Sequence, residues 1–220
     1  MPDARSQPPR PPEAPASGPV ELGPKKERRA ASDRRMLRAA TALIAARGVA
    51  GANLAQIGLD AGYSRGLPVQ RFGSKLALLL AVLDAIEARF LRHVARRVGD
   101  RQGRAAIVER IRLQLEAVRD MPESAIALYH LIIESTGAMP DLAPRVAQLQ
   151  AAYHDNLRVY LQEAREFGEL RADLDIDAAA RILSGTIGGM SIQAIVDGRT
   201  DRLGAEAEAL SLLLTDRLLR

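Results

Sequence analysis

The feature that most limits the fold of this chain is the spacing of its apolar side chains, which recur every three or four residues from Met36 almost to the C-terminus. The first such group comprises Met36, Leu37, Ala40, Leu43 and Ile44. This spacing places side chains on one face of an α-helix, and no long stretch shows the alternation typical of a half-buried strand. We therefore expect an all-α protein with about nine helices.

Composition supports this expectation and limits the chemistry of the protein. Hydrophobic residues make up 47% of the chain but aromatic residues only 3%, so the core must be built mainly from Ala, Leu, Ile and Val. Because the chain has no cysteine, disulfides and thiolate metal sites are excluded. We find neither a signal peptide nor a run of about 18 apolar residues, and expect a soluble cytoplasmic protein without a membrane span.

The N-terminal region differs in composition from the rest. Residues 1–24 hold eight of the twelve prolines, and we predict a disordered tail over residues 1–31 because such a segment buries little apolar surface. The tail ends in a basic run of Lys25, Lys26, Arg28 and Arg29. This run is interpreted either as a solubilising linker or as an arm that lies along DNA phosphates.

Positive charge is concentrated near this end of the chain. Residues 25–75 contain eleven Lys and Arg against three Asp and Glu, a local charge of +8, whereas the net charge of the whole chain is +4. A basic segment on a mildly acidic body is typical of a module that binds a polyanion, although a solvated charged surface has the same composition.

The most informative stretch runs from Asn53 to Lys75. Asn53 is expected to cap a helix whose inward face carries Leu54, Ile57 and Ala61, with Gln56 as a capping-box partner. Gly58 is small at the position where a second helix approaches, and Gly62 permits a tight left-handed turn. Ser64 is expected to cap the next short helix. Two short helices joined so closely indicate a helix-turn-helix.

The second helix of such a pair fits the DNA major groove, where base edges are distinguishable. The side chains that we expect to be exposed on it are Arg65, Leu67, Val69, Gln70 and Arg71. Gln70 is suited to bind adenine, and Arg65 or Arg71 to bind guanine or phosphate. Asn53, Ser64 and Lys75 complete the predicted DNA-binding set. The helix that begins after Ser74 offers free backbone N–H groups, which favour phosphate.

At these residues the chain resembles the TetR family of bacterial transcriptional regulators. The resemblance covers residues 34–90 and is carried by Arg47-Gly48, Ala61-Gly62-Tyr63-Ser64, the Phe72–Lys75 segment and, in compressed form, Leu79–Leu83. It implies a helix-turn-helix DNA-binding head at residues 32–78 and a C-terminal ligand-binding and dimerisation bundle at residues 79–220.

The recognition segment departs from the family pattern. Val69 stands where members usually carry a tyrosine that bonds phosphate, and Arg71 is a candidate to replace that contact by charge. Pro68 removes an early intrahelical hydrogen bond, so we expect the recognition helix to begin late or as a 3₁₀ turn.

The predicted helix ending near Asp197 contains Gly185, Gly188 and Gly189, each of which costs about 1 kcal/mol relative to Ala within a helix. Close packing within one subunit, a ligand, or a partner helix would each compensate this cost. The resemblance implies a dimeric four-helix bundle formed by the last two helices of each chain. The predicted interface comprises Ser184, Gly185, Gly188, Ile192, Leu210 and Leu214.

The resemblance also implies a small-molecule pocket in the C-terminal part. Polar or soft side chains within the apolar pattern suggest the lining Met121, Tyr129, His130, Glu134, Tyr153 and Gln193, although core positions would produce the same pattern. His130, Glu134 and His154 are conceivable metal ligands, but core or surface histidines are the preferred interpretation.

Together these features predict a homodimeric DNA-binding regulator, a repressor released by an unknown small-molecule effector from a near-palindromic double-stranded operator. No catalytic constellation is present, and we expect neither enzyme activity nor a cofactor or metal. The alternatives are a constitutive DNA-binding protein without a ligand, and a helical ligand-binding protein or enzyme without DNA function.

Overall fold

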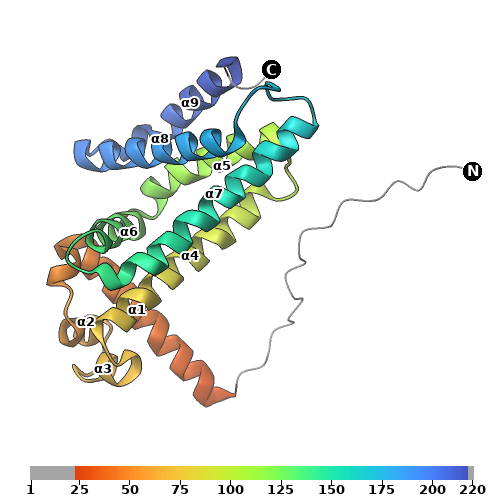
Figure 1. Ribbon diagram of the computed structural model, residues 1–220. Helices are drawn as coiled ribbons and strands as arrows, with labels where there is room; N and C mark the ends of the chain where they lie inside the picture. Colours follow the sequence, from red (N-terminus) through yellow and green to blue (C-terminus); the bar gives the residue numbers. More distant parts are fainter. Residues whose placement is uncertain (1–22, 218–220) are drawn as a thin grey trace, which may run out of the picture.

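The computed structural model describes residues 23–217, which form α-helices joined by turns and two short 3₁₀ helices (Figure 1). The expected all-α fold is confirmed. The elements in chain order are α1 (Pro24–Gly51), α2 (Leu54–Asp60), α3 (Leu67–Phe72), α4 (Lys75–Val98), α5 (Gly103–Asp120), α6 (Pro122–Ser135), η1 (Pro140–Leu142), α7 (Ala143–Glu166), α8 (Ile176–Asp197), η2 (Thr200–Arg202) and α9 (Leu203–Arg217).

The molecule is elongated, with α2 and α3 at one end and α8 and α9 at the other (Figure 1). The long helices α4 and α7 run between these ends. One core joins α1, α2 and α4 to α6, and includes Met36, Ile57, Leu79 and Leu131. The predicted domain boundary after residue 78 therefore falls inside α4, and buried side chains from both sides of it share this core.

A second core lies in the C-terminal bundle. It is formed by α5, α7, α8 and α9, with Ile111, Leu157, Leu183 and Leu203 among its buried members. Helix α5 is central, because it packs against α4, α6, α7, α8 and α9. Almost every side of α5 is thus covered, which forces some of its polar residues into the interior.

The first helix begins earlier than expected. Residues 24–31 belong to α1 and are not a structureless tail, while the rest of the predicted tail, residues 1–22, lies outside the described residues. Proline occupies the first turn of α1, where its fixed φ suits a helix and its missing N–H is not needed. The Lys-, Arg- and Ala-rich segment that follows has high helix propensity.

The predicted cap at Asn53 is confirmed, and two further helices begin with a capping side chain. Gly48 interrupts α1 with a φ of 68°, Asn53 Oδ1 accepts from Gln56 N at 2.7 Å, and Ser74 Oγ accepts from Ala77 N at 3.1 Å. The Asp175 side chain caps α8. The prediction of a capping box at α2 is wrong in one part, because the Gln56 side chain donates to Asp60 and does not bond back to the backbone of Asn53.

Helix α8 is the one described helix whose length and composition also suit a membrane span, with a mean hydropathy of 1.2. Only 33% of its most apolar window is buried. Such a helix is weak evidence for a membrane, because core helices of other proteins share these properties. Its packing on α5 and α7 places one face of α8 in the bundle and leaves the other uncovered.

Candidate DNA-binding surface and effector cavity

Helices α2 and α3 approach each other as closely as a helix-turn-helix requires. A Cβ placed on Gly58 would lie 2.4 Å from the Ser64 carbonyl oxygen and 3.1 Å from Pro68 Cδ, so only glycine fits there. The turn that follows depends on Gly62, whose φ is 80°. The predicted close approach at Gly58 and the left-handed turn at Gly62 are both confirmed.

The start of α3 differs in part from the expectation. The helix begins at Leu67, with Gly66 and not Ser64 as its N-cap residue and with no capping side chain. Pro68 occupies the first turn, where it is buried beneath α2. The late start predicted from Pro68 is therefore confirmed, and the predicted Ser64 cap is wrong, because a short turn from Ser64 to Leu67 comes first.

Of the five side chains predicted to be exposed on the recognition helix, Arg65, Val69 and Gln70 are exposed. Leu67 is not, because its side chain is half-buried and packs against the core of the head. The expectation that Leu67 is exposed is therefore wrong. Leu67 is the first residue of α3, and it lies on the face of this short helix that packs against the head.

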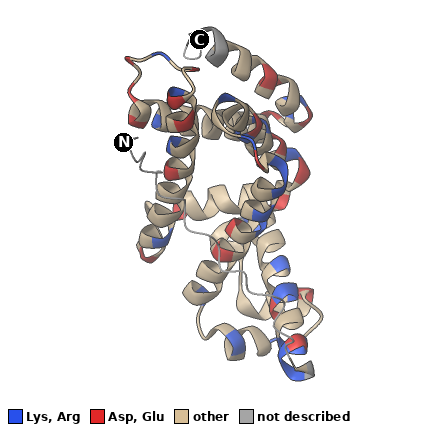
Figure 2. Cartoon of the chain, turned by 90° about the vertical axis from the view of Figure 1, so that its right-hand side faces the viewer, with Lys and Arg blue, Asp and Glu red and all other residues tan. Residues whose placement is uncertain are grey.

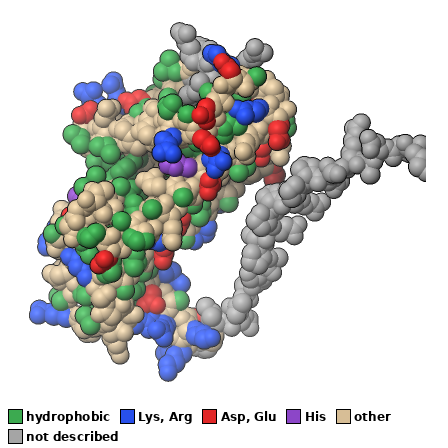
Figure 3. Space-filling view, viewed as in Figure 1, with side chains coloured by type: hydrophobic (Ala, Val, Ile, Leu, Met, Phe, Trp, Pro, Cys, Tyr) green, Lys and Arg blue, Asp and Glu red, His purple; other side chains and the backbone are tan. Residues whose placement is uncertain are grey.

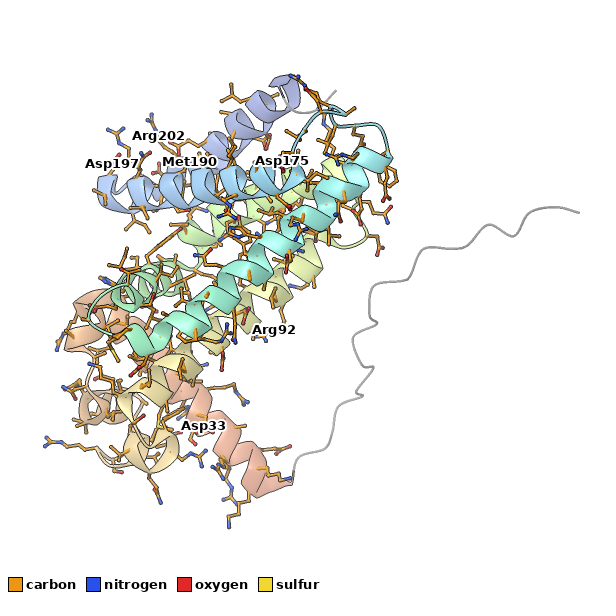
Figure 4. All side chains as sticks on the ribbon, viewed as in Figure 1. Asp33, Arg92, Asp175, Met190, Asp197 and Arg202 are labelled. Atoms are coloured by element: carbon orange, nitrogen blue, oxygen red, sulfur yellow. The ribbon has the colours of Figure 1, made fainter. Side chains whose placement is uncertain are left out.

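The expectation that Arg71 is exposed is also wrong. Its Nε and Nη2 donate to Asp33 Oδ1 at 2.8 and 2.7 Å, and Nη2 also donates to the Arg29 carbonyl oxygen at 3.0 Å. Only 15% of the Arg71 side chain is accessible. Asp33, labelled in Figure 4, lies on α1 beside α3. Arg71 therefore fastens the candidate recognition helix to α1.

The other predicted contacts lie at neighbouring helix starts. Asn53 and Ser64 are exposed, and Lys75 is half-buried, with its Nζ donating to the Ala50 carbonyl oxygen at 3.3 Å. Exposed basic residues of the first turns of α1, among them Lys25 and Lys26, extend this end of the molecule. Figure 3 shows Lys and Arg side chains gathered around it. The result is a basic surface next to α3.

A cavity of about 170 Å³ lies in the C-terminal bundle, between α4, α5, α6, α7 and α8. Met121, Tyr129 and Tyr153 line it, as the sequence predicted. The other three predicted lining residues do not. His130 lies next to Gly48 of α1, Glu134 lies near the end of α6, and Gln193 is exposed on α8. Within residues 23–217 no group of three or more potential metal ligands is present.

The outer surface of α8 is apolar and uncovered. Ile182 and Val196 are 65% and 78% exposed, and Ile192 is exposed too, as are Leu212 and Leu213 of α9. Figure 4 labels Asp175 and Asp197 at the two ends of α8, and the charged residues between them are Asp177 and Arg181. Figure 2 colours Lys and Arg blue along the chain and shows several of them at the lower end of the molecule, which carries α2 and α3. Large apolar patches on an uncovered helix mark interaction surfaces.

The glycines of α8 make no close contacts within the chain. A Cβ on Gly185, Gly188 or Gly189 would meet no atom within 4 Å, so tight packing inside one subunit does not explain them. Gly185 is exposed with Ile192, whereas Ser184 and Gly188 line the cavity. Leu210 is half-buried in the second core, and the Leu214 side chain lies outside the described residues.

Two family models match the chain. The model described as "Bacterial regulatory proteins, tetR family" matches residues 36–82, and that described as "BetI-type transcriptional repressor, C-terminal" matches residues 109–220. The chain belongs to the TetR family. It is therefore a DNA-binding transcriptional regulator, as the helix-turn-helix indicated. No curated protein sequence shows significant similarity to it.

Solved TetR-family structures share the fold. A regulator from Chloroflexus aurantiacus J-10-FL is 21% identical with a TM-score of 0.77, over 89% of this chain and 98% of that one. A putative regulator from Saccharomonospora viridis, solved with choline, is 23% identical with a TM-score of 0.72 (87% and 99%). FadR from Bacillus subtilis, solved with stearoyl-CoA, is 18% identical with a TM-score of 0.74 (83% and 97%).

Sequence reasoning missed the most unusual residue of this TetR-family cavity. Arg110 of α5 lines the cavity and is only 3% exposed, and burial lowers the pKa of its guanidinium. A signal was available, since Arg110 and Gln114 lie three and seven residues after Ile107 and so share the apolar face of α5. Burial also raises the pKa of Tyr153 to about 12.

Proposed function

We propose that this TetR-family protein is a homodimeric repressor that binds a near-palindromic operator through α3 and releases it when a small molecule fills the cavity. The observation that carries the proposal is the exposure of Arg65 and Gln70 on a helix held against α2 and α1. We propose residues 32–78, with the start of α1, as the DNA-binding head, and residues 79–220 as the effector and dimer region.

Within the head, each exposed side chain has a role that its chemistry suits. Gln70 has the paired donor and acceptor that recognise adenine, and Arg65 the donors that recognise guanine or phosphate. Val69 offers an apolar contact to a thymine methyl group. Asn53, Ser64 and Lys75 lie at helix starts and suit backbone phosphates, as does the basic beginning of α1.

The exposed apolar surface of α8 and α9 supports the homodimer. Ile182, Ile192 and Val196 on α8 would be buried by the same surface of a second copy, as two-fold symmetry requires. Gly185 and Gly189 would allow the two α8 helices to approach closely. The two α3 helices would then face successive major grooves about 34–36 Å apart, which favours a near-palindromic operator.

The cavity is connected to the head by shared side chains. Ile86 of α4 and Leu128 and Ile132 of α6 line the cavity and also belong to, or pack against, the core of the head. On α6, Tyr129 lines the cavity while the adjacent His130 lies beside Gly48 of α1. An effector that favours one arrangement of α4 and α6 would thereby alter the position of α3, through its differential affinity for the two states.

The neighbouring structures solved with choline and with stearoyl-CoA hold quite different molecules in one fold. They support a small-molecule effector for this chain without identifying it. A cytoplasmic location follows from the proposed binding to chromosomal DNA.

The proposal is tested with duplexes selected from a random pool by the purified full chain. Fluorescence anisotropy against the selected duplex is measured for the wild type, Arg65→Ala, Gln70→Ala and the control Arg171→Ala. Arg171 is exposed in the loop between α7 and α8, and Figure 1 shows this loop at the other end of the molecule from α3. We expect each head variant to lose roughly 5- to 100-fold in affinity, and the control to lose none.

Selection of no preferred sequence, or equal competition by unrelated duplex, would contradict a sequence-specific operator. Tight operator binding that no cavity ligand weakens would instead identify a constitutive DNA-binding protein.

A further inference from the structure

The cavity contains a positive charge without a counter-ion. Arg110 is 3% exposed, and its hydrogen bonds within the described part of the chain go to neutral amides. Its Nε donates to Asn156 Oδ1 at 3.0 Å and its Nη1 to Gln114 Oε1 at 2.8 Å. A buried charge is normally paired, because removing it from water is strongly unfavourable.

The carboxylates near Arg110 are engaged elsewhere. Glu109 precedes it on α5 but accepts from Arg97 Nε at 2.7 Å and from Arg112. Glu116 also pairs with Arg97, at 3.1 Å. Glu87, which also lines the cavity, pairs with Arg145 of α7. These three acids are thus paired with Arg97, Arg112 and Arg145, and no ion pair joins any of them to Arg110.

A second polar group in the cavity is also unsatisfied. The hydroxyl of Tyr153 is buried and has no hydrogen-bond partner among the described residues. Its ring lies against Arg110, with Cζ 4.7 Å from the ring centroid, and Phe90 flanks the guanidinium at 4.8 Å. A free phenol and an unpaired guanidinium therefore lie together in the cavity, and both are donors.

We propose that the effector is an organic anion, with a carboxylate that binds Arg110 and the Tyr153 hydroxyl and an apolar body along Ile86, Leu128 and Ile132. This inference rests on the proposed function, because it specifies the molecule that occupies the effector cavity. An arginine–carboxylate pair supplies the missing counter-ion, and charge-assisted hydrogen bonds of this kind are the strong ones. The three apolar residues are those shared with the core of the head.

The same geometry disfavours a cationic effector such as choline. Aromatic faces are what hold a quaternary ammonium group in proteins. Here the faces of Phe90 and Tyr153 already contact the guanidinium of Arg110. A second cation would therefore lose its aromatic contacts and meet a like charge in a poorly solvated cavity.

The test is a calorimetric measurement of the affinity of the full-length protein for octanoate and for phenylbutyrate. Octanol and octyltrimethylammonium serve as the neutral and cationic comparison probes. We expect at least one carboxylate to bind the wild type about 30-fold more tightly than either comparison probe. We expect Arg110→Gln to abolish that preference. The matched control Arg119→Gln, on the same helix but exposed and paired with Asp120, should keep it.

Equal binding of anion, alcohol and ammonium, or binding of neither carboxylate, would overturn the proposal. If Arg110→Gln fails to fold, Tyr153→Phe provides the second variant, with an expected loss of about 5-fold for the carboxylate alone. Anisotropy with the operator separates the two proposals. Arg110-dependent carboxylate binding that leaves operator affinity unchanged supports the anion site and contradicts effector-controlled repression. Operator binding by a protein that binds neither carboxylate contradicts the anion site and supports the proposed DNA-binding function.

Discussion

At the scale of single residues, neighbours in the recognition helix have opposite tasks. Gln70 is exposed to solvent, whereas Arg71 is held by Asp33 of α1 and by the Arg29 carbonyl oxygen. The charge of Arg71 resembles that of a DNA-contacting arginine, yet its partners are within the protein. Its position on the helix, and not its residue type, decides its role.

Arg71→Ala should therefore lower the free energy of unfolding by about 2 kcal/mol, because charged hydrogen bonds in a mostly buried site are lost. Gln70→Ala should change it by less than about 0.5 kcal/mol. Urea denaturation measures both. A double-mutant cycle with Asp33→Ala provides the control, and additive effects of the two substitutions would show that the pair does not interact.

The unpaired hydroxyl of Tyr153 makes stability depend on pH. Burial raises the pKa of Tyr153 to about 12, whereas a tyrosine in the unfolded chain ionises near 10. Since the folded pKa is the higher one, this contribution to stability is complete below pH 10 and is lost as the pH rises towards 12.

The free energy of unfolding of the wild type should thus fall relative to that of Tyr153→Phe between pH 10 and 12. Below pH 9 the variant should be as stable as the wild type or more so, because an unsatisfied buried hydroxyl is removed. Chemical denaturation at each pH gives the difference, and a constant difference across the range would contradict the assignment.

At the scale of elements, the pair α2 and α3 depends on one close approach. Gly58→Ala would bring a Cβ to 2.4 Å from the Ser64 carbonyl oxygen, and the backbone must move to relieve the contact. We expect a loss of about 1–3 kcal/mol in stability, as for other overpacked sites.

Gly66→Ala is the matched control, because Gly66 has an ordinary φ of −84° and open space around it. Thermal unfolding compares the two variants. Equal melting temperatures would show that α2 and α3 are not packed as closely as the geometry indicates.

At the scale of the whole molecule, the exposed apolar surface of α8 and α9 lies at the opposite end from α3 (Figure 1). Val196→Glu should convert the proposed dimer into a monomer, because a charge would be buried in the interface. Sedimentation velocity measures the state, and operator affinity should fall with it. Val159→Glu, on the exposed side of α7, is the control and should leave the sedimentation coefficient unchanged.

A dimer that survives Val196→Glu would place the interface on another surface. A wild-type monomer that still binds a two-half-site operator would contradict the homodimer itself.

The sequence alone determined the helices, their caps and the tight turn of the head, because these features depend on local interactions. The helix periodicity, the turn at Gly62 and the caps at Asn53, Ser74 and Asp175 depend on residues within a few positions of one another, and the close approach at Gly58 on residues within ten. The late start of α3 followed from Pro68 in the same way.

Only the tertiary structure decided which side of each helix faces which neighbour. Tyr129 lines the cavity while His130 lies against α1, and Arg71 is held by a residue 38 positions away. Arg110 became a buried, unpaired cation because α5 is enclosed by helices distant in sequence. Such outcomes depend on the packing of distant segments, which spacing along one helix does not specify.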